Sequence, residues 1–321
     1  MIAKMNAFTS LSLPADGGVN AGNPVGPIDC VIIGGDIANR QEPPIQSASA
    51  SWVQFTADYV DGLTLEGRNH LKTALLLIPG NHDVSNAIGY PRVMSPPTDS
   101  TSMVNIYALM MASRRPPGAY DYAREKIHYS RDIGGLHLMF VNMWPDSAER
   151  IWMTSDLAEV EARTPVILFA HDEPAVESKH FTNPNGVHDI NPRDRFENLI
   201  PEAFKDGTGT VSDPSTIEQR GFAAFVKARP NIVAYFHGND NENRFYVYAG
   251  PDSTIALDTF DVDSPMKGNI SRSDESKLSF QLVSIDTDHL TMTVRECLWN
   301  QGPTIVFGAS TTVSLAPGLM K

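Results

Sequence analysis

The stretch Leu77–Asp83, LIPGNHD, decides which fold this sequence predicts. An apolar run ends there in a Pro-Gly turn, and three polar residues follow at once. Strands that stop at such a turn deliver side chains to one edge of a sheet, where binding sites are commonly built. Asn81 offers a carbonyl oxygen to a hard cation, His82 can exchange a proton near neutral pH, and Asp83 can orient the neighbouring imidazole. We therefore expect a functional site at this turn.

Three further apolar runs end in polar residues in the same way. Residues 29–33 are followed by Asp36, residues 165–170 by His171, and residues 231–236 by the sequence HGNDN. Each polar cluster has an ordinary structural explanation by itself, such as a Gly-Asp turn, a helix cap, a buried structural histidine or a polar hairpin turn. Four such strand ends in one chain are hard to explain as coincidence, so we expect them to form a common site.

The composition is that of an ordinary globular protein, and it limits the classes of partner. Of the 321 residues, 41% are hydrophobic and 20% are charged. The net charge of -13 argues against a long nucleic acid or an anionic membrane as the main partner. A phosphorylated small molecule or a nucleotide remains compatible, since bound metal ions can reverse the local charge. No apolar run approaches the ~18 residues needed to cross a membrane, so we expect no membrane span.

Apolar periodicity predicts helices and strands of a single α/β domain over residues 1–321. No internal repeat or low-complexity linker divides the chain. Helices are predicted over residues 47–62, 102–113, 147–162 and 216–228. Strands are predicted over residues 29–33, 74–78, 129–132, 136–142, 165–170, 231–236, 244–249, 254–258, 278–285 and 288–297.

The ordered polar blocks resemble those of the calcineurin-like metallophosphoesterases. That family carries D-x-H, G-D, G-N-H-[DE], a lone His and G-H-x-H in this order, and the matching positions here are Asp36, residues 80–83, His171 and residues 238–241. The resemblance covers nearly the whole chain. It implies an α/β fold, a four-layer αββα sandwich in which two mixed β-sheets are flanked by helices. It also implies a hydrolase of phosphoric esters, a phosphatase or phosphodiesterase, in which a metal-bound hydroxide attacks phosphorus.

The resemblance gives each block a role. Asp36 would bridge two divalent metal ions, and Asn81 with His171 would bind the second of them. His82 would stabilise the transition state or protonate the leaving group, held by Asp83. Mixed nitrogen and oxygen ligands suit Mn, Fe, Zn or Ni better than Ca. Two such cations would hold a phosphoryl oxygen and activate a water for in-line attack.

The sequence departs from the family pattern in two places. No Asp-x-His pair occurs in residues 1–35, so we expect the chain to begin after the first strand of the fold, which leaves a sheet edge unpaired. In the last block Asn239 and Asn241 replace the two family histidines, and His237 is an alternative ligand one residue before the glycine. Both changes weaken the first metal position. We therefore predict at most one tightly held metal in this chain.

Substrate contacts are predicted on both sides of the site. The polar segment 173–198 follows the lone histidine and holds Lys179 and His180 as candidate phosphate contacts. Arg244 and Tyr246 follow the last block and are similar candidates. The alternative explanation of segment 173–198 is a solvated loop that does not touch the substrate.

A second function fits the same residues. The missing first block and the asparagine substitutions favour a catalytically impaired relative that binds a ligand or a partner protein. Hydrolysis of p-nitrophenyl phosphate with added Mn²⁺ separates the two hypotheses. No targeting signal is visible, which predicts a cytoplasmic protein by default, or a secreted or periplasmic one if an upstream signal has been lost. The sequence carries no signal for an oligomeric state.

Overall fold

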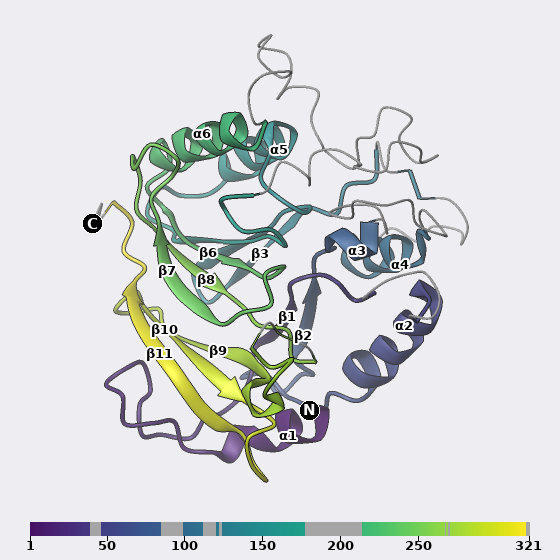
Figure 1. The fold of residues 1–321 in the computed structure, drawn as a ribbon. Coiled ribbons are helices and arrows are strands. Elements are labelled where there is room, and N and C mark those ends of the chain that lie inside the picture. Colours follow the sequence, from purple (N-terminus) through teal and green to yellow (C-terminus); the bar gives the residue numbers. More distant parts are fainter. Residues whose placement is uncertain are drawn as a thin grey trace.

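The computed structural model describes residues 1–38, 46–84, 99–111, 120–121, 124–176, 214–266, 268 and 270–318. Within these ranges the chain forms a mixed α/β fold with two multi-stranded sheets, a strand pair and several helices (Figure 1). The helices are α1 (Ile2–Ala7), α2 (Ala48–Phe55), α3 (Asn81–Val84), α4 (Thr101–Met110), α5 (Ser147–Leu157) and α6 (Pro214–Lys227). The strands are β1 (Cys30–Ile33), β2 (Ala74–Leu77), β3 (Tyr129–Ile133), β4 (Leu136–Phe140), β5 (Val166–Phe169), β6 (Ile232–His237), β7 (Arg244–Tyr248), β8 (Leu257–Asp261), β9 (Ser279–Asp286), β10 (Thr291–Leu298) and β11 (Val306–Ser314).

The largest sheet contains six strands in the order β3-β4-β5-β6-β8-β7. Strands β4, β5, β6 and β8 run parallel to one another, whereas β3 and β7 run antiparallel to their neighbours. The apolar strand β5 is buried along its whole length, as expected of a parallel strand that is covered on both faces. Because parallel strands end at the same edge, the polar residues that follow β5 and β6 are brought together there.

A row of aromatic rings crosses this sheet on one face. Tyr129, Phe140, Phe169, Phe236 and Phe260 are register partners on neighbouring strands. Successive ring centroids lie 4.6, 4.9, 5.2 and 4.6 Å apart. Such pairs add about 0.5–1.5 kcal/mol each beyond the burial of their surface. The row therefore helps to fix the strand register close to the edge where the polar residues begin.

A second layer of strands packs against the six-stranded sheet. It consists of the parallel pair β1–β2 and the antiparallel sheet β11-β10-β9. Leu76 and Met292 from this layer share one core cluster with Phe140 and Phe236 of the larger sheet. In the described part of the chain β1 pairs with β2 alone, and its apolar residues are only partly buried. One edge of β1 therefore carries no strand among these residues.

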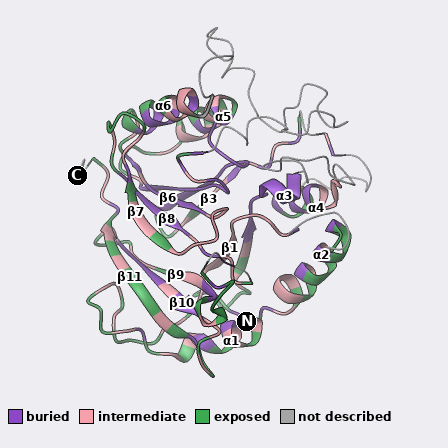
Figure 2. Cartoon of the chain, viewed as in Figure 1, coloured by how far each residue is buried: buried purple, intermediate pink, exposed green. Residues whose placement is uncertain are grey.

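Helices α5 and α6 cover the outer face of the six-stranded sheet, and α4 lies beside β2 of the second layer (Figure 1). Met153 of α5 and Phe222 of α6 pack on Leu168 of the larger sheet. Met5 of α1 packs near Cys297 of the second layer. Figure 2 shows buried residues concentrated in the six-stranded sheet, whereas the edge strand β11 is largely exposed. Within the described ranges, no helix could span a membrane.

The observed elements differ from the predicted ones mainly at their ends. Helix α2 ends at Phe55 and continues as a wider helical turn to Asp61, and α5 ends at Leu157 rather than at residue 162. Strand β8 begins three residues later than predicted, and strand β11 was not predicted. The sequence of β11, VFGASTTVS, is rich in small and polar residues because this edge strand faces solvent, so its apolar alternation is weak.

Candidate functional site

The structure brings the ends of several predicted strands to one edge of the fold. Asp36 lies three residues after β1, Asn81 begins α3 after β2, and His171 lies two residues after β5. The imidazole of His171 contacts both Gly34 and Asn81, so the ends of β1, β2 and β5 meet directly. Asn239, in the turn after β6, is connected to this group through Gly238, whose N–H donates to the carbonyl oxygen of His171.

His171 is buried at the centre of this cluster. Its Nδ1 lies 2.6 Å from the carbonyl oxygen of Gly34, which can only accept, so Nδ1 carries a proton. Its Nε2 lies 3.1 Å from Asn81 Oδ1 and 3.5 Å from Asp36 Oδ1. Burial disfavours the imidazolium, but the carboxylates of Asp36 and Asp172 raise the pKa of His171. Nε2 therefore faces two oxygen atoms and requires either a proton or a cation between itself and them.

Three candidate ligands have a left-handed backbone conformation. The angle φ is 57° at Asp36, 67° at Asn239 and 55° at Asn241. Met143, whose carbonyl oxygen accepts the N–H of His171, has a φ of 61°. This region costs non-glycine residues about 1–3 kcal/mol and is concentrated at functional sites, although Asn and Asp tolerate it best. The packing around these turns must therefore hold them in place.

Two glycines leave room for the Asp36 carboxylate and the His171 ring. A Cβ at Gly80 would lie 2.2 Å from Asp36 Oδ1 and 2.7 Å from His171 Cε1. At Gly35, where φ is 99°, a Cβ would lie 2.5 Å from the backbone nitrogen of Gly80 and 2.6 Å from His171 Nδ1. Cβ atoms do not approach other heavy atoms so closely, so both positions require glycine.

Asp83 ties the turns after β1 and β2 together. Its carboxylate accepts hydrogen bonds from the backbone N–H groups of Ile37, Ala38 and Gly80, at 3.1, 3.0 and 3.0 Å. Burial, together with the charge of the neighbouring aspartate, raises the pKa of Asp83 to about 6. The sequence suggested that Asp83 orients the imidazole of His82, and this stays a prediction. The role as a link between two turns was not foreseen.

His82 borders the same cluster. Its backbone N–H donates to Asp36 Oδ1 at 3.0 Å, and its Nε2 lies 3.9 Å from Asp36 Oδ2. The side chain is 9% exposed, so the ring is largely shielded from bulk water. A group bound at Asp36 would therefore be within reach of the His82 ring.

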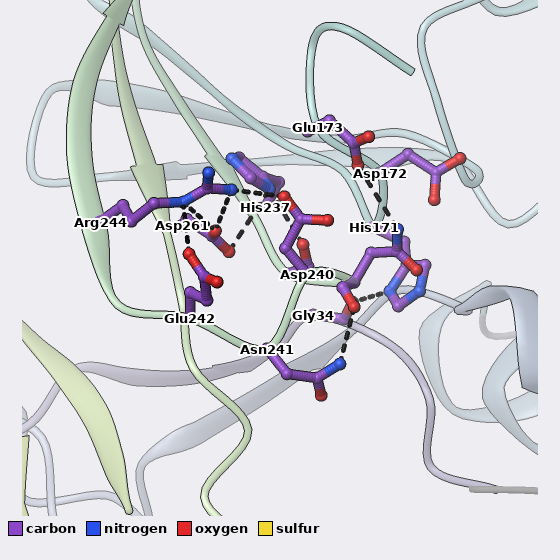
Figure 3. Close-up of polar contacts among 12 residues, drawn as sticks. Gly34, His171, Asp172, Glu173, His237, Asp240, Asn241, Glu242, Arg244 and Asp261 are labelled. Atoms are coloured by element: carbon purple, nitrogen blue, oxygen red, sulfur yellow. Dashed lines mark hydrogen bonds and ion pairs between the residues drawn. The ribbon is translucent and has the colours of Figure 1, made fainter. Parts of the chain in front are cut away.

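The turn after β6 is stabilised by hydrogen bonds of its own asparagines (Figure 3). Asn241 Nδ2 donates to the carbonyl oxygen of Asn239 at 2.8 Å, and Asn239 Nδ2 donates to Glu173 Oε2 at 3.4 Å. Because both amide nitrogens are used in this way, the amide oxygens are the atoms that could bind a cation. Glu173 places a carboxylate beside the last block, which was predicted only as the start of a polar segment.

Arg244 anchors this turn from strand β7 (Figure 3). Its guanidinium binds Asp261 Oδ2 through contacts of 2.9 and 2.7 Å and also contacts Asp240 and Glu242. Burial raises the pKa of Asp261, and the Arg244 guanidinium opposes that rise. Carboxylates therefore neutralise much of the charge of Arg244, which was predicted to contact substrate.

His237 and Tyr246 contact each other next to the turn formed by residues 238–241. His237 Nε2 lies 2.8 Å from the Tyr246 hydroxyl, and Nδ1 lies 3.0 Å from the carbonyl oxygen of Gly238. Burial lowers the pKa of His237 to about 4. Tyr235, two residues earlier on β6, packs in the core under α6. Side chains two residues apart on a strand share a face, so His237 lies on the helix-covered side of the sheet.

Some of the predicted site residues cannot be placed. Lys179 and His180 lie outside the described residues. Among the residues that are described, no group of three or more His, Cys, Asp and Glu side chains is placed to hold a metal ion. The cluster at the strand ends instead combines Asp36 and His171 with the amide of Asn81.

Two backbone carbonyl groups that contribute to the site were not predicted from the sequence. The carbonyl oxygen of Gly34 sets the protonation of His171, and a backbone carbonyl leaves no signal in residue type. Met143 supplies the carbonyl that receives the His171 N–H. Its neighbour Asn142 is a polar residue after an apolar run, which is the same signal that marked the other strand ends. The predicted strand over residues 136–142 included Asn142, so the signal was not used.

No protein-family model matches the chain, and no curated protein matches it. The functional assignment therefore depends on the geometry and chemistry of the strand-end cluster.

Proposed function

We propose that this protein is a metal-dependent phosphoesterase with a calcineurin-like αββα fold, which hydrolyses phosphomonoesters or phosphodiesters. The observation that carries the proposal is the arrangement at His171, whose Nε2 lies 3.1 Å from Asn81 Oδ1 and 3.5 Å from Asp36 Oδ1. Nitrogen and oxygen atoms that bind one transition-metal ion at about 2.0–2.2 Å lie roughly 3 to 3.5 Å from each other. The spacing of His171 Nε2 from each of these two oxygens therefore suits ligands of a single cation.

The arrangement of layers supports the same proposal. Two layers of strands share one core, helices lie outside them, and the polar residues follow the strands at one edge. Asp36, Asn239 and Asn241 also have the left-handed backbone conformation that is concentrated at functional sites, although Asn and Asp adopt it in ordinary turns too.

Each residue of the cluster has a defined task in this proposal. Asp36, Asn81 and His171 would hold the ion, and Mn, Fe, Zn or Ni suits this set of donors. When bound, the ion supplies Lewis-acid chemistry that polarises a phosphoryl oxygen and lowers the pKa of a coordinated water. The carbonyl oxygen of Gly34 keeps the proton on His171 Nδ1 and leaves Nε2 free for the ion. His82, beside Asp36, would donate a proton to the leaving oxygen.

Arg244 and Tyr246 stay proposed substrate contacts, together with Lys179 and His180. The Arg244 guanidinium has one fully buried partner, Asp261, and two partly exposed partners, Asp240 and Glu242, whose side chains are 36% and 34% exposed. A substrate phosphate could therefore replace Asp240 while the buried pair with Asp261 stays intact.

A catalytically impaired protein that binds a ligand or a partner is the second candidate. The last block favours it, because Asn239 and Asn241 stand where the family pattern has two histidines. An amide oxygen is also a weaker ligand for these metals than the imidazole it replaces. A second cation would therefore be bound poorly, and the reaction would depend on one ion.

Hydrolysis of p-nitrophenyl phosphate and of its bis ester with added Mn²⁺ tests the proposal. We expect turnover by the unaltered protein and a loss of about 10²- to 10⁴-fold in His82→Ala. His289→Ala is the matched control, because His289 is an exposed histidine paired with Asp286, and its activity should be unchanged. If the unaltered protein binds Mn²⁺ through His171, so that His171→Ala abolishes binding, but shows no turnover, the binding protein is supported instead.

A further inference from the structure

The turn between β4 and α5 lies against the turn that carries His171. The carbonyl oxygen of Met143, in the first of these turns, accepts hydrogen bonds from the backbone N–H groups of His171 and Asp172, at 3.0 and 3.1 Å. Met143 is an apolar residue with a φ of 61°, a left-handed conformation that favours glycine and that Asn and Asp tolerate better. The contacts around Met143 must therefore hold its carbonyl oxygen in this direction.

Glu149, in the first turn of α5, contacts the same turn with a buried carboxylate. Its Oε2 accepts the backbone N–H of Asn142 at 3.3 Å, and its Oε1 lies 2.9 Å from His128 Nδ1. Its own backbone N–H donates to Asp146 Oδ1, the cap of the helix, at 2.9 Å. Glu149 therefore joins the start of α5 to the residue that immediately precedes Met143.

The ring of His128 is fixed in turn by α5. It stacks on Trp152, with ring centroids 4.3 Å apart and an angle of 6° between the planes. Trp152 follows Glu149 by three residues, so both side chains lie on one face of the helix. Movement of the carboxylate away from Asn142 would also break its contact with this ring. The link between α5 and the turn is therefore held at both carboxylate oxygens.

Stabilisation of the helix alone does not account for this arrangement. An acidic residue in the first turn of a helix is favourable because it interacts with the helix dipole, and an exposed carboxylate serves that purpose. Glu149 is only 1% exposed, and burial of a carboxylate is costly unless specific partners compensate for it. Its partners here are the backbone beside Met143 and the stacked imidazole.

We propose that Glu149 is a positioning residue for His171, because it holds the Met143 carbonyl oxygen against the His171 backbone N–H. This inference rests on the proposed function, since it takes His171 as a ligand of the cation. Glu149 acts through the backbone and not as a ligand, because its two oxygens contact Asn142 and His128. Removal of a residue that orients a metal ligand typically weakens metal binding by about 10- to 100-fold.

Mn²⁺ affinity of the full chain, measured by equilibrium dialysis, tests this role. Glu149→Ala should weaken Mn²⁺ binding by about 10- to 100-fold. Glu149→Gln keeps an acceptor oxygen for the Asn142 N–H and can donate to His128 Nδ1, so it should bind Mn²⁺ within about threefold of the unaltered protein. Glu218→Ala is the matched control, because it removes a buried carboxylate that pairs with Arg150 of the same helix at 2.9 Å. Its Mn²⁺ affinity should be unchanged.

A measurement without metal separates this inference from the proposed function. The Nδ1–H of His171, bonded to the Gly34 carbonyl, is expected to give a slowly exchanging NMR signal, which the His171→Ala protein identifies by its loss. In the metal-free protein this signal should shift in Glu149→Ala and stay in place in Glu149→Gln and Glu218→Ala.

Two kinds of failure can then be told apart. An unchanged His171 signal in Glu149→Ala, an Mn²⁺ affinity equal to that of the unaltered protein, or the same changes in Glu218→Ala would overturn the positioning role and leave the metal site intact. If the unaltered protein bound no Mn²⁺ but the His171 signal shifted in Glu149→Ala alone, the metal assignment would fall and the positioning of His171 by Glu149 would stand.

Discussion

Replacing Asp83 with alanine tests whether one buried carboxylate holds the site together. The carboxylate accepts hydrogen bonds from three backbone N–H groups on two different turns. Each buried donor left without a partner costs about 1–3 kcal/mol. Against this, its pKa of about 6 implies a cost of about 3 kcal/mol for keeping the buried carboxylate ionised at neutral pH. Three unpaired donors cost about 3–9 kcal/mol, so we expect Asp83→Ala to lower the free energy of unfolding by about 0–6 kcal/mol, with a central value of about 3 kcal/mol.

Urea unfolding at neutral pH, followed by circular dichroism, measures this change. Asp252→Ala is the matched control, because Asp252 forms an exposed ion pair with Arg220 and its loss should cost less than about 1 kcal/mol. The same Asp83→Ala protein should bind Mn²⁺ more weakly, since the turn that carries Asp36 loses its connection to Gly80. A loss of stability below about 1 kcal/mol together with unchanged Mn²⁺ affinity would refute the reasoning.

Three further predictions follow from the described contacts. Gly80→Ala, whose Cβ would meet Asp36 Oδ1 at 2.2 Å, should weaken Mn²⁺ binding at least about tenfold in calorimetry and cost about 1–3 kcal/mol of stability; unchanged binding would contradict the assigned geometry. His137 lies between two aspartates at 2.8 and 2.7 Å, which raise its pKa although burial lowers it. Its stabilisation should be complete below about pH 6.5 and lost as the pH rises through the raised pKa, so His137→Gln should flatten the pH dependence of urea unfolding, and an unaltered slope would argue against the pairing. Arg295→Met should cost about 3 kcal/mol because it leaves Asp16 without its buried partner, and adding Asp16→Ala should restore part of that loss in the same assay.

The parts of the fold that could be predicted from the sequence are those set by local patterns. Strands β5 and β6 are apolar runs bounded by polar residues; β5 lies within its predicted range, and β6 extends one residue beyond its range, to His237. The polar residues after them meet at one edge because parallel strands end together, which follows from general rules of sheet geometry. The proximity of His171 to the turn after β6 was therefore foreseeable without coordinates. Its contact with Asn81 was not, because Asn81 follows β2 in the other layer of strands.

The parts that could not be predicted depend on backbone atoms and on contacts between distant segments. The carbonyl oxygen of Gly34 contacts a histidine 137 residues further along the chain, and no residue type reports this contact. The hydrogen bonds that Asp83 accepts from backbone N–H groups of another turn were not predicted, because the sequence pointed only to its neighbour His82. His237 lies on the helix-covered face of the sheet because side chains alternate between the two faces along β6. The sequence was compatible with either face.

Equilibrium dialysis against Mn²⁺, followed by metal analysis, tests the central claim most directly. The account predicts close to one equivalent of Mn²⁺ in the unaltered protein and none in His171→Ala, while His289→Ala should match the unaltered protein. The absence of bound metal in the unaltered protein, or equal binding by His171→Ala, would contradict the assignment of Asp36, Asn81 and His171 as a metal site. Two tightly held equivalents would contradict the inference that the last block binds its cation poorly.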